Sequence, residues 1–152
     1  MSIIKITKQF SFEMAHALRN YDGLCRNIHG HSYKMDITLA GQPLHDETSP
    51  KNGMVMDFGD LKKLVNEEII SLLDHALVLN AKTDAQLVEV LKQNYEKIVT
   101  VDFQPTTENL LNFIAEKIQT RLPDDVKLSC VRLRETDTSY AEWCENQVTG
   151  NR

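Results

Sequence analysis

The chain has little of what a secreted, membrane-bound or exported protein needs. Its three cysteines, Cys25, Cys130 and Cys144, are an odd number without the spacing of a disulfide framework, which predicts a reducing compartment, the cytosol. No apolar run approaches the roughly 18 residues of a membrane span. The first ten residues lack the apolar core and the small-residue cleavage site of a signal peptide, so we expect none.

Basic residues are outnumbered by acidic ones, 17 to 22. The formal net charge is -5, and the nearest thing to a basic patch is Lys62-Lys63, inside a helical pattern that is typical of a solvated face. We therefore expect neither nucleic acid nor an anionic membrane as a partner. The length of 152 residues fits one domain with a sizeable core.

Periodicity predicts an α+β domain. Apolar and polar residues alternate over 3–16 and again over 33–39, as in half-buried strands. Further strands are expected at 54–58, at 98–103, and as a pair within 126–144 that is split at "TDTS". Helical spacing predicts helices over 59–73 and 105–122, and a less regular one over 87–98. This order indicates an antiparallel sheet with helices on one face, whose open face needs a cover such as oligomerisation.

Three histidines fall in phase on the expected strands. His29 and His31 flank Gly30, and period two places both on one face; His16 ends the apolar face of the first strand. If the two strands are neighbours, three imidazoles meet, a set that suits Zn²⁺ with a fourth position open for water or substrate. The alternative is a set of buried core histidines, which is the commoner role for a residue such as His16 taken alone.

Cys25 has two competing interpretations. As a fourth ligand it would close the zinc site and make it structural. As a free thiol beside a cation it would have a lowered pKa and act as a base or nucleophile. Spacing alone does not decide between them.

Six segments occur in the order known from one family: "FSFEMAH", "CRNIHGHSY", "GMVMDFGDLKKLV", "LDHALVLN", "PTTENL" and "RETDTSYAEW". The chain resembles the 6-pyruvoyl-tetrahydropterin synthase / 6-carboxy-tetrahydropterin synthase family over nearly all its length except 82–103. The resemblance implies one domain over 1–152 with the tunnelling fold (T-fold), and with 82–103 as an extended insertion. It also implies an antiparallel sheet with two main helices on one face, assembled into a barrel, typically a homo-hexamer of two stacked trimers with active sites between subunits.

The resemblance also implies roles for single residues. The zinc ligands of the family match His16, His29 and His31, and its catalytic base matches Cys25. Its Asp-His pair, which usually reaches the site of a neighbouring subunit, matches Asp74 and His75. Its catalytic glutamate, which binds the amino-pyrimidine edge of the pterin and belongs to the charge relay, matches Glu135.

Plainer interpretations remain open for several of these residues. Asp74 and His75 could simply end a helix, where a cationic histidine favours the C-terminal dipole. Glu135 ends an apolar row on the last strands, where a carboxylate could accept two hydrogen bonds from a guanidine-like edge or face solvent. Thr106, Thr107 and Glu108 could contact the pterin, but they also form a complete helix N-terminus.

Two activities of the family start from 7,8-dihydroneopterin triphosphate. One eliminates triphosphate to leave a pyruvoyl side chain. The other also releases acetaldehyde and leaves 6-carboxy-tetrahydropterin for queuosine and other deazapurines. Three residues separate Cys25 from "HGH", the spacing of the carboxy branch. We therefore expect a zinc-dependent carbon-carbon lyase, with a pyruvoyl synthase or a non-catalytic, zinc-stabilised pterin-binding module as alternatives.

Overall fold

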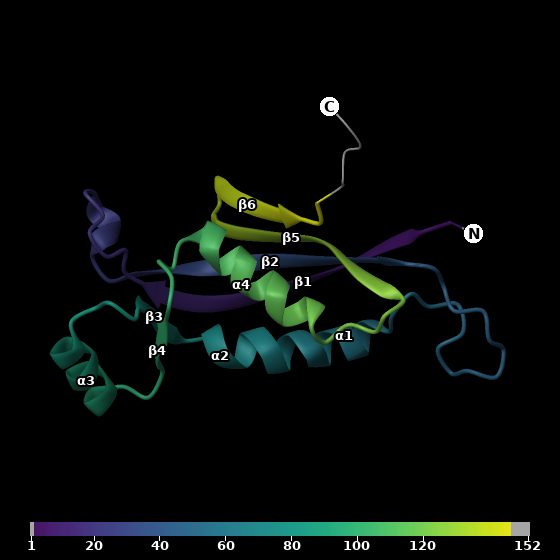
Figure 1. The fold of residues 1–152 in the computed structure, drawn as a ribbon, viewed down its shortest axis with the longest axis horizontal. Helices are drawn as coiled ribbons and strands as arrows, with labels where there is room; N and C mark the ends of the chain where they lie inside the picture. The colour runs from purple at the N-terminus through teal and green to yellow at the C-terminus, as the bar shows by residue number, and fades with distance from the viewer. Residues whose placement is uncertain (1, 147–152) are drawn as a thin grey trace.

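The computed structural model describes residues 2–146. Its centre is a six-stranded sheet (Figure 1). Its strands lie in the order β4-β3-β1-β2-β5-β6. Their bounds are β1 (Ile4–His16), β2 (His29–Gly41), β3 (Ala76–Asn80), β4 (Ile98–Val101), β5 (Val126–Thr136) and β6 (Ser139–Cys144). The α+β class expected from periodicity is confirmed.

The long antiparallel pair β1–β2 is the centre of the sheet. It stays in register from the pair Ile4–Gly41 to the pair His16–His29. Side chains of β1 alternate as period two requires, so that Phe12 is buried and the neighbouring Glu13 is exposed. The strands expected over 3–16 and 33–39 are thus confirmed, and β2 starts early enough to include both histidines of "HGH".

The sheet is mixed, whereas the sequence pattern predicted an antiparallel one. Strands β1, β2, β5 and β6 are antiparallel, but β3 runs parallel to β1 and β4 runs parallel to β3. Parallel neighbours need a long crossover, and helix α3 (Ala85–Asn94) provides it between β3 and β4. The segment 82–103 is therefore a helix and an edge strand added to the sheet.

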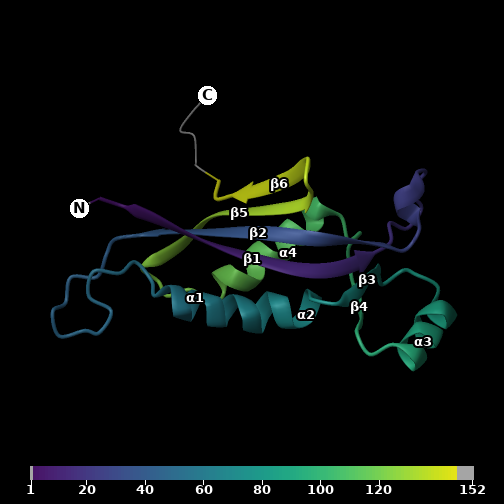
Figure 2. The same ribbon diagram turned by 180° about the vertical axis from the view of Figure 1, so that it is seen from behind.

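Two helical segments cover one face of the sheet. The first consists of α1 (Phe58–Val65), a π-helical turn η2 (Asn66–Ile70) and α2 (Ser71–Leu73), and the second is α4 (Thr107–Gln119). Helix α4 crosses in front of the strands in Figure 1 and behind them in Figure 2. The short strand expected at 54–58 is wrong, because Asp57 accepts a hydrogen bond from Gly59 N–H and caps α1 instead.

Apolar side chains fill the space between this face and the helices. The largest fully buried ones are Phe12, Tyr33, Met35, Ile37, Leu39, Leu61, Ile69, Leu73, Leu110, Ile114, Ile118 and Leu133. The opposite face carries polar groups, such as the hydrogen-bonded pair Thr7 and Thr38. Among the described residues, no helix combines the length and the apolarity needed to cross a membrane.

Candidate functional site

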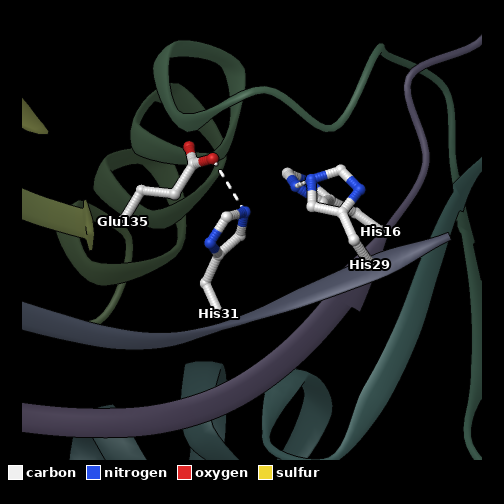
Figure 3. A group of neighbouring side chains, drawn as sticks. All are labelled: His16, His29, His31 and Glu135. Atoms are coloured by element: carbon white, nitrogen blue, oxygen red, sulfur yellow. Dashed lines mark hydrogen bonds and ion pairs between the residues drawn. The ribbon is translucent and has the colours of Figure 1, made fainter. Parts of the chain in front are cut away.

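Three imidazoles meet where β1 ends and β2 begins (Figure 3). The register pairs His16 with His29 and Met14 with His31, so all three rings lie on the helix-covered face. Their centroids are 4.6 to 5.2 Å apart. The sequence prediction that the three histidines share one face is confirmed.

Two backbone carbonyls set the orientation of two of these rings. Nδ1 of His16 lies 2.7 Å from the oxygen of Pro105, and Nδ1 of His29 lies 2.7 Å from the oxygen of Asn27. A carbonyl oxygen only accepts, so each Nδ1 carries the proton and each neutral ring presents a bare lone pair at Nε2. Backbone carbonyls commonly fix metal-binding histidines in this way.

These lone pairs face one another. Nε2 of His16 lies 3.1 Å from Nε2 of His29, an arrangement that is repulsive unless a proton or a cation lies between the rings. Burial lowers the pKa of His16, with the nearby His29 and His31 acting in the same direction, which disfavours a proton. Tetrahedral bonds of 2.0–2.1 Å would place two nitrogen ligands roughly 3.3 Å apart. The pair therefore fits a metal ion.

The third imidazole, that of His31, also has a nitrogen atom without a hydrogen-bond partner. Nε2 of His31 is buried and makes no hydrogen bond, although it lies 2.9 Å from Oε1 of Glu135. The contact is close, but its direction is wrong for a hydrogen bond. One donor atom from each of His16, His29, His31 and Glu135 lies within 4.8 Å of the other three. The four side chains together could hold a metal ion.

Glu135 is connected to the start of helix α4. Its Oε2 accepts a hydrogen bond from the hydroxyl of Thr107, which is buried. Thr106 caps the helix by accepting from Asn109 N–H at 3.2 Å, so its structural interpretation is confirmed. Glu108 is exposed and lines a small cavity of ≈ 110 Å³ together with Thr107 and Glu135. The structure therefore brings Thr107 and Glu108 next to Glu135.

Cys25 lies outside the cluster of donor atoms. It is half-buried in the 3₁₀ turn η1 (Leu24–Arg26), and its carbonyl accepts a hydrogen bond from Leu18 N–H at 3.0 Å. Its thiol is not among the atoms that gather within 4.8 Å; the fourth such group is Glu135. This geometry gives no support to a closed site made of one cysteine and three histidines.

Asp74 and His75 lie outside the cluster of donor atoms, beside β1 at the point where β3 begins. Oδ1 of Asp74 accepts from Glu13 N–H at 2.9 Å, and Oδ2 lies 3.1 Å from Nδ1 of His75. The hydrogen bond from Glu13, then His75 and the charge of Lys97, hold the pKa of Asp74 below its usual range. Helix α2 ends at this point, as the plainer interpretation predicted, and His75 adopts a left-handed backbone with φ of 64°.

The imidazole of His75 projects into a large open groove. The groove has a volume of ≈ 1020 Å³ and is lined by residues of β1, β2, β3 and the α3–β4 segment, among them Glu13, His75 and Tyr95. His75 is 75% exposed. His75 therefore lines the same groove as His31 of its own chain, but it is not among the donor atoms that gather within 4.8 Å of one another.

Sequence reasoning missed several groups of the site. The carbonyls of Asn27 and Pro105 carry no sequence signal, because any residue could supply them. Tyr33 is fully buried beside His31, and its hydroxyl makes no hydrogen bond; burial, then the charge of Glu135, raises its pKa. Period two after "HGH" places Tyr33 on the same face, which is the signal that could have found it.

Comparisons with known proteins agree over nearly the whole chain. The sequence pattern of the family described as 6-pyruvoyl tetrahydropterin synthase matches residues 5–146. The 6-carboxy-5,6,7,8-tetrahydropterin synthase of Haemophilus influenzae is 35% identical over 145 residues, which are 94% of this chain and 100% of that protein.

Two solved structures resemble this chain along almost their full lengths. An uncharacterized protein from Wolinella succinogenes has a TM-score of 0.76 at 22% identity, over 96% of this chain and 100% of that one. The 6-pyruvoyl tetrahydropterin synthase of Caenorhabditis elegans has a TM-score of 0.65 at 26% identity, and the match covers 96% of this chain and 98% of that one. Because its identity to this chain is only 22%, the Wolinella succinogenes structure supports the fold alone.

Proposed function

Because this chain belongs to the 6-pyruvoyl tetrahydropterin synthase family, we propose that it is a zinc-dependent carbon-carbon lyase. It converts 7,8-dihydroneopterin triphosphate to 6-carboxy-5,6,7,8-tetrahydropterin and releases acetaldehyde and triphosphate. Its fold is the tunnelling fold of the family. The relative from Haemophilus influenzae, named for the carboxy product, and the three residues between Cys25 and "HGH" support this reaction over formation of a pyruvoyl product.

The opposed Nε2 atoms of His16 and His29 carry the proposal. Their protons are held at Nδ1 by carbonyls, and Nε2 of the third ring, His31, lacks a hydrogen bond. Three neutral imidazoles with an open fourth position form a zinc site of the catalytic kind. Bound there, Zn²⁺ would polarise the side-chain oxygens of the substrate as a Lewis acid.

The remaining side chains would bind the substrate and move protons. Cys25, as a thiolate, would take a proton from the side chain of the pterin. Glu135, held by Thr107, would accept hydrogen bonds from the amino-pyrimidine edge. This use of Glu135 leaves the fourth position of the metal to the substrate.

Asp74 and His75 would serve the site of another copy. Asp74 would orient His75 and stabilise its cationic form, as an aspartate does in a triad. The exposure of His75, and the fact that neither residue is part of the donor cluster of the chain's described residues, support an assembly with active sites between subunits, the homo-hexamer of two stacked trimers. The three unpaired cysteines suit the cytosol, where the product would enter synthesis of queuosine or another deazapurine.

Product analysis tests the reaction. Zinc-loaded protein incubated with 7,8-dihydroneopterin triphosphate should yield acetaldehyde and 6-carboxy-tetrahydropterin in equal amounts, measured by mass spectrometry after acetaldehyde is trapped as a hydrazone. A pyruvoyl pterin without acetaldehyde would assign the protein to the other branch. Tight pterin binding without any product would instead identify a non-catalytic binding module.

The substitution Glu135→Gln separates pterin binding from metal binding. A charge-assisted hydrogen bond contributes about 1.5 to 3 kcal/mol, so the dissociation constant of a pterin should rise about 10- to 100-fold while the zinc content stays unchanged. Fluorescence titration and atomic absorption measure the two quantities. Glu116→Gln, an exposed change on α4, is the matched control. Loss of zinc with unchanged pterin affinity would make Glu135 a metal ligand instead.

A further inference from the structure

Two of the three cysteines face one another at the edge of the sheet, far along β5 from Glu135. Cys130 and Cys144 are direct partners in the β5–β6 register, and their sulfur atoms lie 2.8 Å apart. Neither residue has a role in the proposed pterin reaction. The pair is a dithiol held in place by the backbone of a hairpin.

The strand geometry suits a bond between these two sulfurs. Glu145 N–H donates to the oxygen of Ser129, so the neighbouring Cys130–Cys144 pair is of the non-hydrogen-bonded kind, with Cα atoms about 4.5 Å apart. A disulfide accepts Cα separations of about 4.4–6.8 Å. The backbone therefore needs no rearrangement for the two side chains to join.

A β-bulge turns Cys130 toward its partner. Along β5 the pairing with β2 passes from Thr38–Cys130 to Leu39–Leu128, which leaves Ser129 as the extra residue. Strict alternation from the buried Leu128 would have pointed Cys130 into the core; the bulge shifts the phase, and Val131 is buried instead. Cys130 thus lies on the face of the sheet that no helix covers, opposite Cys144.

The surroundings favour a dithiol reaction over a metal site. Glu142 is the one further ligand-type group beside the two thiols in the described part of the chain. Its Oε1 is held by Nε and Nη2 of Arg132, at 2.7 and 2.6 Å. The two thiols also differ: Cys144 is exposed, whereas Cys130 is half-buried, and burial followed by the neighbouring Cys144 raises the pKa of Cys130 to about 12.

We propose that Cys130 and Cys144 are a redox modification site that closes to a disulfide on reaction with a low-molecular-weight disulfide such as oxidised glutathione. The thiolate of Cys144 attacks one sulfur of the glutathione disulfide, forms a mixed disulfide and releases one glutathione thiolate. The thiol of Cys130 then loses its proton and attacks the sulfur of Cys144, releasing the second glutathione. The protein loses two electrons and two protons, and one glutathione disulfide becomes two glutathiones.

Closure would join the edge strand β6 covalently to β5. The hairpin that these strands form also carries Glu135 near its turn, so oxidation would restrict the element that presents this carboxylate. Cys25 has no second cysteine beside it among the described residues, since the pair of contacting thiols is Cys130 and Cys144. The reaction of Cys25 with oxidised glutathione should therefore stop at the mixed disulfide.

Peptide mass spectrometry tests the site without reference to turnover. The full-length protein is equilibrated with oxidised glutathione, remaining thiols are alkylated, and the protein is digested with trypsin. Cleavage at Arg132 and Arg134 separates the two cysteines, so closure appears as a cross-linked peptide pair within one chain. We expect this form to exceed glutathione adducts on Cys130 and Cys144 by about tenfold or more, because the second step is intramolecular.

Two variants complete the test. Cys144→Ser should remove the cross-link and leave Cys130 open to alkylation, whereas Cys25→Ser should leave the cross-link unchanged. Separate glutathione adducts on Cys130 and Cys144, unreacted thiols, or cross-links between two chains would each overturn the proposal. None of these outcomes depends on whether the protein forms a carboxypterin.

Discussion

Cys25→Ala is expected to keep its zinc and its fold while kcat falls about 100- to 10,000-fold, the range for the loss of a general acid–base group. Alanine cannot take the proton from the side chain of the pterin. The residue lies in a turn and outside the cluster of donor atoms, so its removal should leave the three imidazoles in place. Turnover at saturating 7,8-dihydroneopterin triphosphate, zinc content by atomic absorption and circular dichroism measure the three properties.

A second cysteine, Cys144, provides the matched control for this experiment. Cys144→Ser also removes one thiol, but at the far end of a hairpin, and under reducing conditions it should retain the kcat of the unmodified protein. If Cys25→Ala lost its zinc in stoichiometric amounts, the closed zinc site considered from the sequence would be supported. A variant with full activity would remove Cys25 from the mechanism.

The position of the three histidines was predictable because it depends on local periodicity. Period two fixes the face of His29 and His31 relative to Tyr33, and the same rule fixes His16 relative to Phe12. Only the pairing of the two strands had to be assumed, and the register supplies it. The start of α4 was predictable because it also depends on nearby residues, since Thr106 acts on an N–H only three residues away. Helix α3 was predicted less well, because it spans Ala85–Asn94 whereas the spacing indicated 87–98.

Features that depend on distant segments were not predictable. Strand β3 is short and joins the sheet through three parallel pairs with the end of β1, which periodicity does not indicate. The contact between His31 and Glu135 joins residues that are more than a hundred positions apart. The position of Asp74 and His75 depends on Glu13 of β1, whose backbone binds both residues, and on no pattern within their own segment.

Removal of zinc is expected to lower the thermal unfolding midpoint by roughly 10 °C and to abolish turnover. A ligand present at 100 to 1,000 times its dissociation constant stabilises the native state by about 3 to 4 kcal/mol, and a chain of this size loses about 2–4 °C per kcal/mol. Without the metal, the lone pairs of His16 and His29 face one another at 3.1 Å. Calorimetry with and without a strong chelator measures the shift.

His31→Ala shows whether this shift comes from the histidine cluster. His31 is the suitable ligand to remove, because the ring of His16 also satisfies the carbonyl of Pro105 and its loss would destabilise the fold directly. The variant should lose zinc and turnover, and the chelator should no longer change its unfolding midpoint. His45→Ala, an exposed change in the connection after β2, should respond to the chelator as the unmodified protein does. A His31→Ala variant that kept stoichiometric zinc would show that the metal binds elsewhere, and the repulsion at Nε2 of His16 would then have to be relieved by a proton.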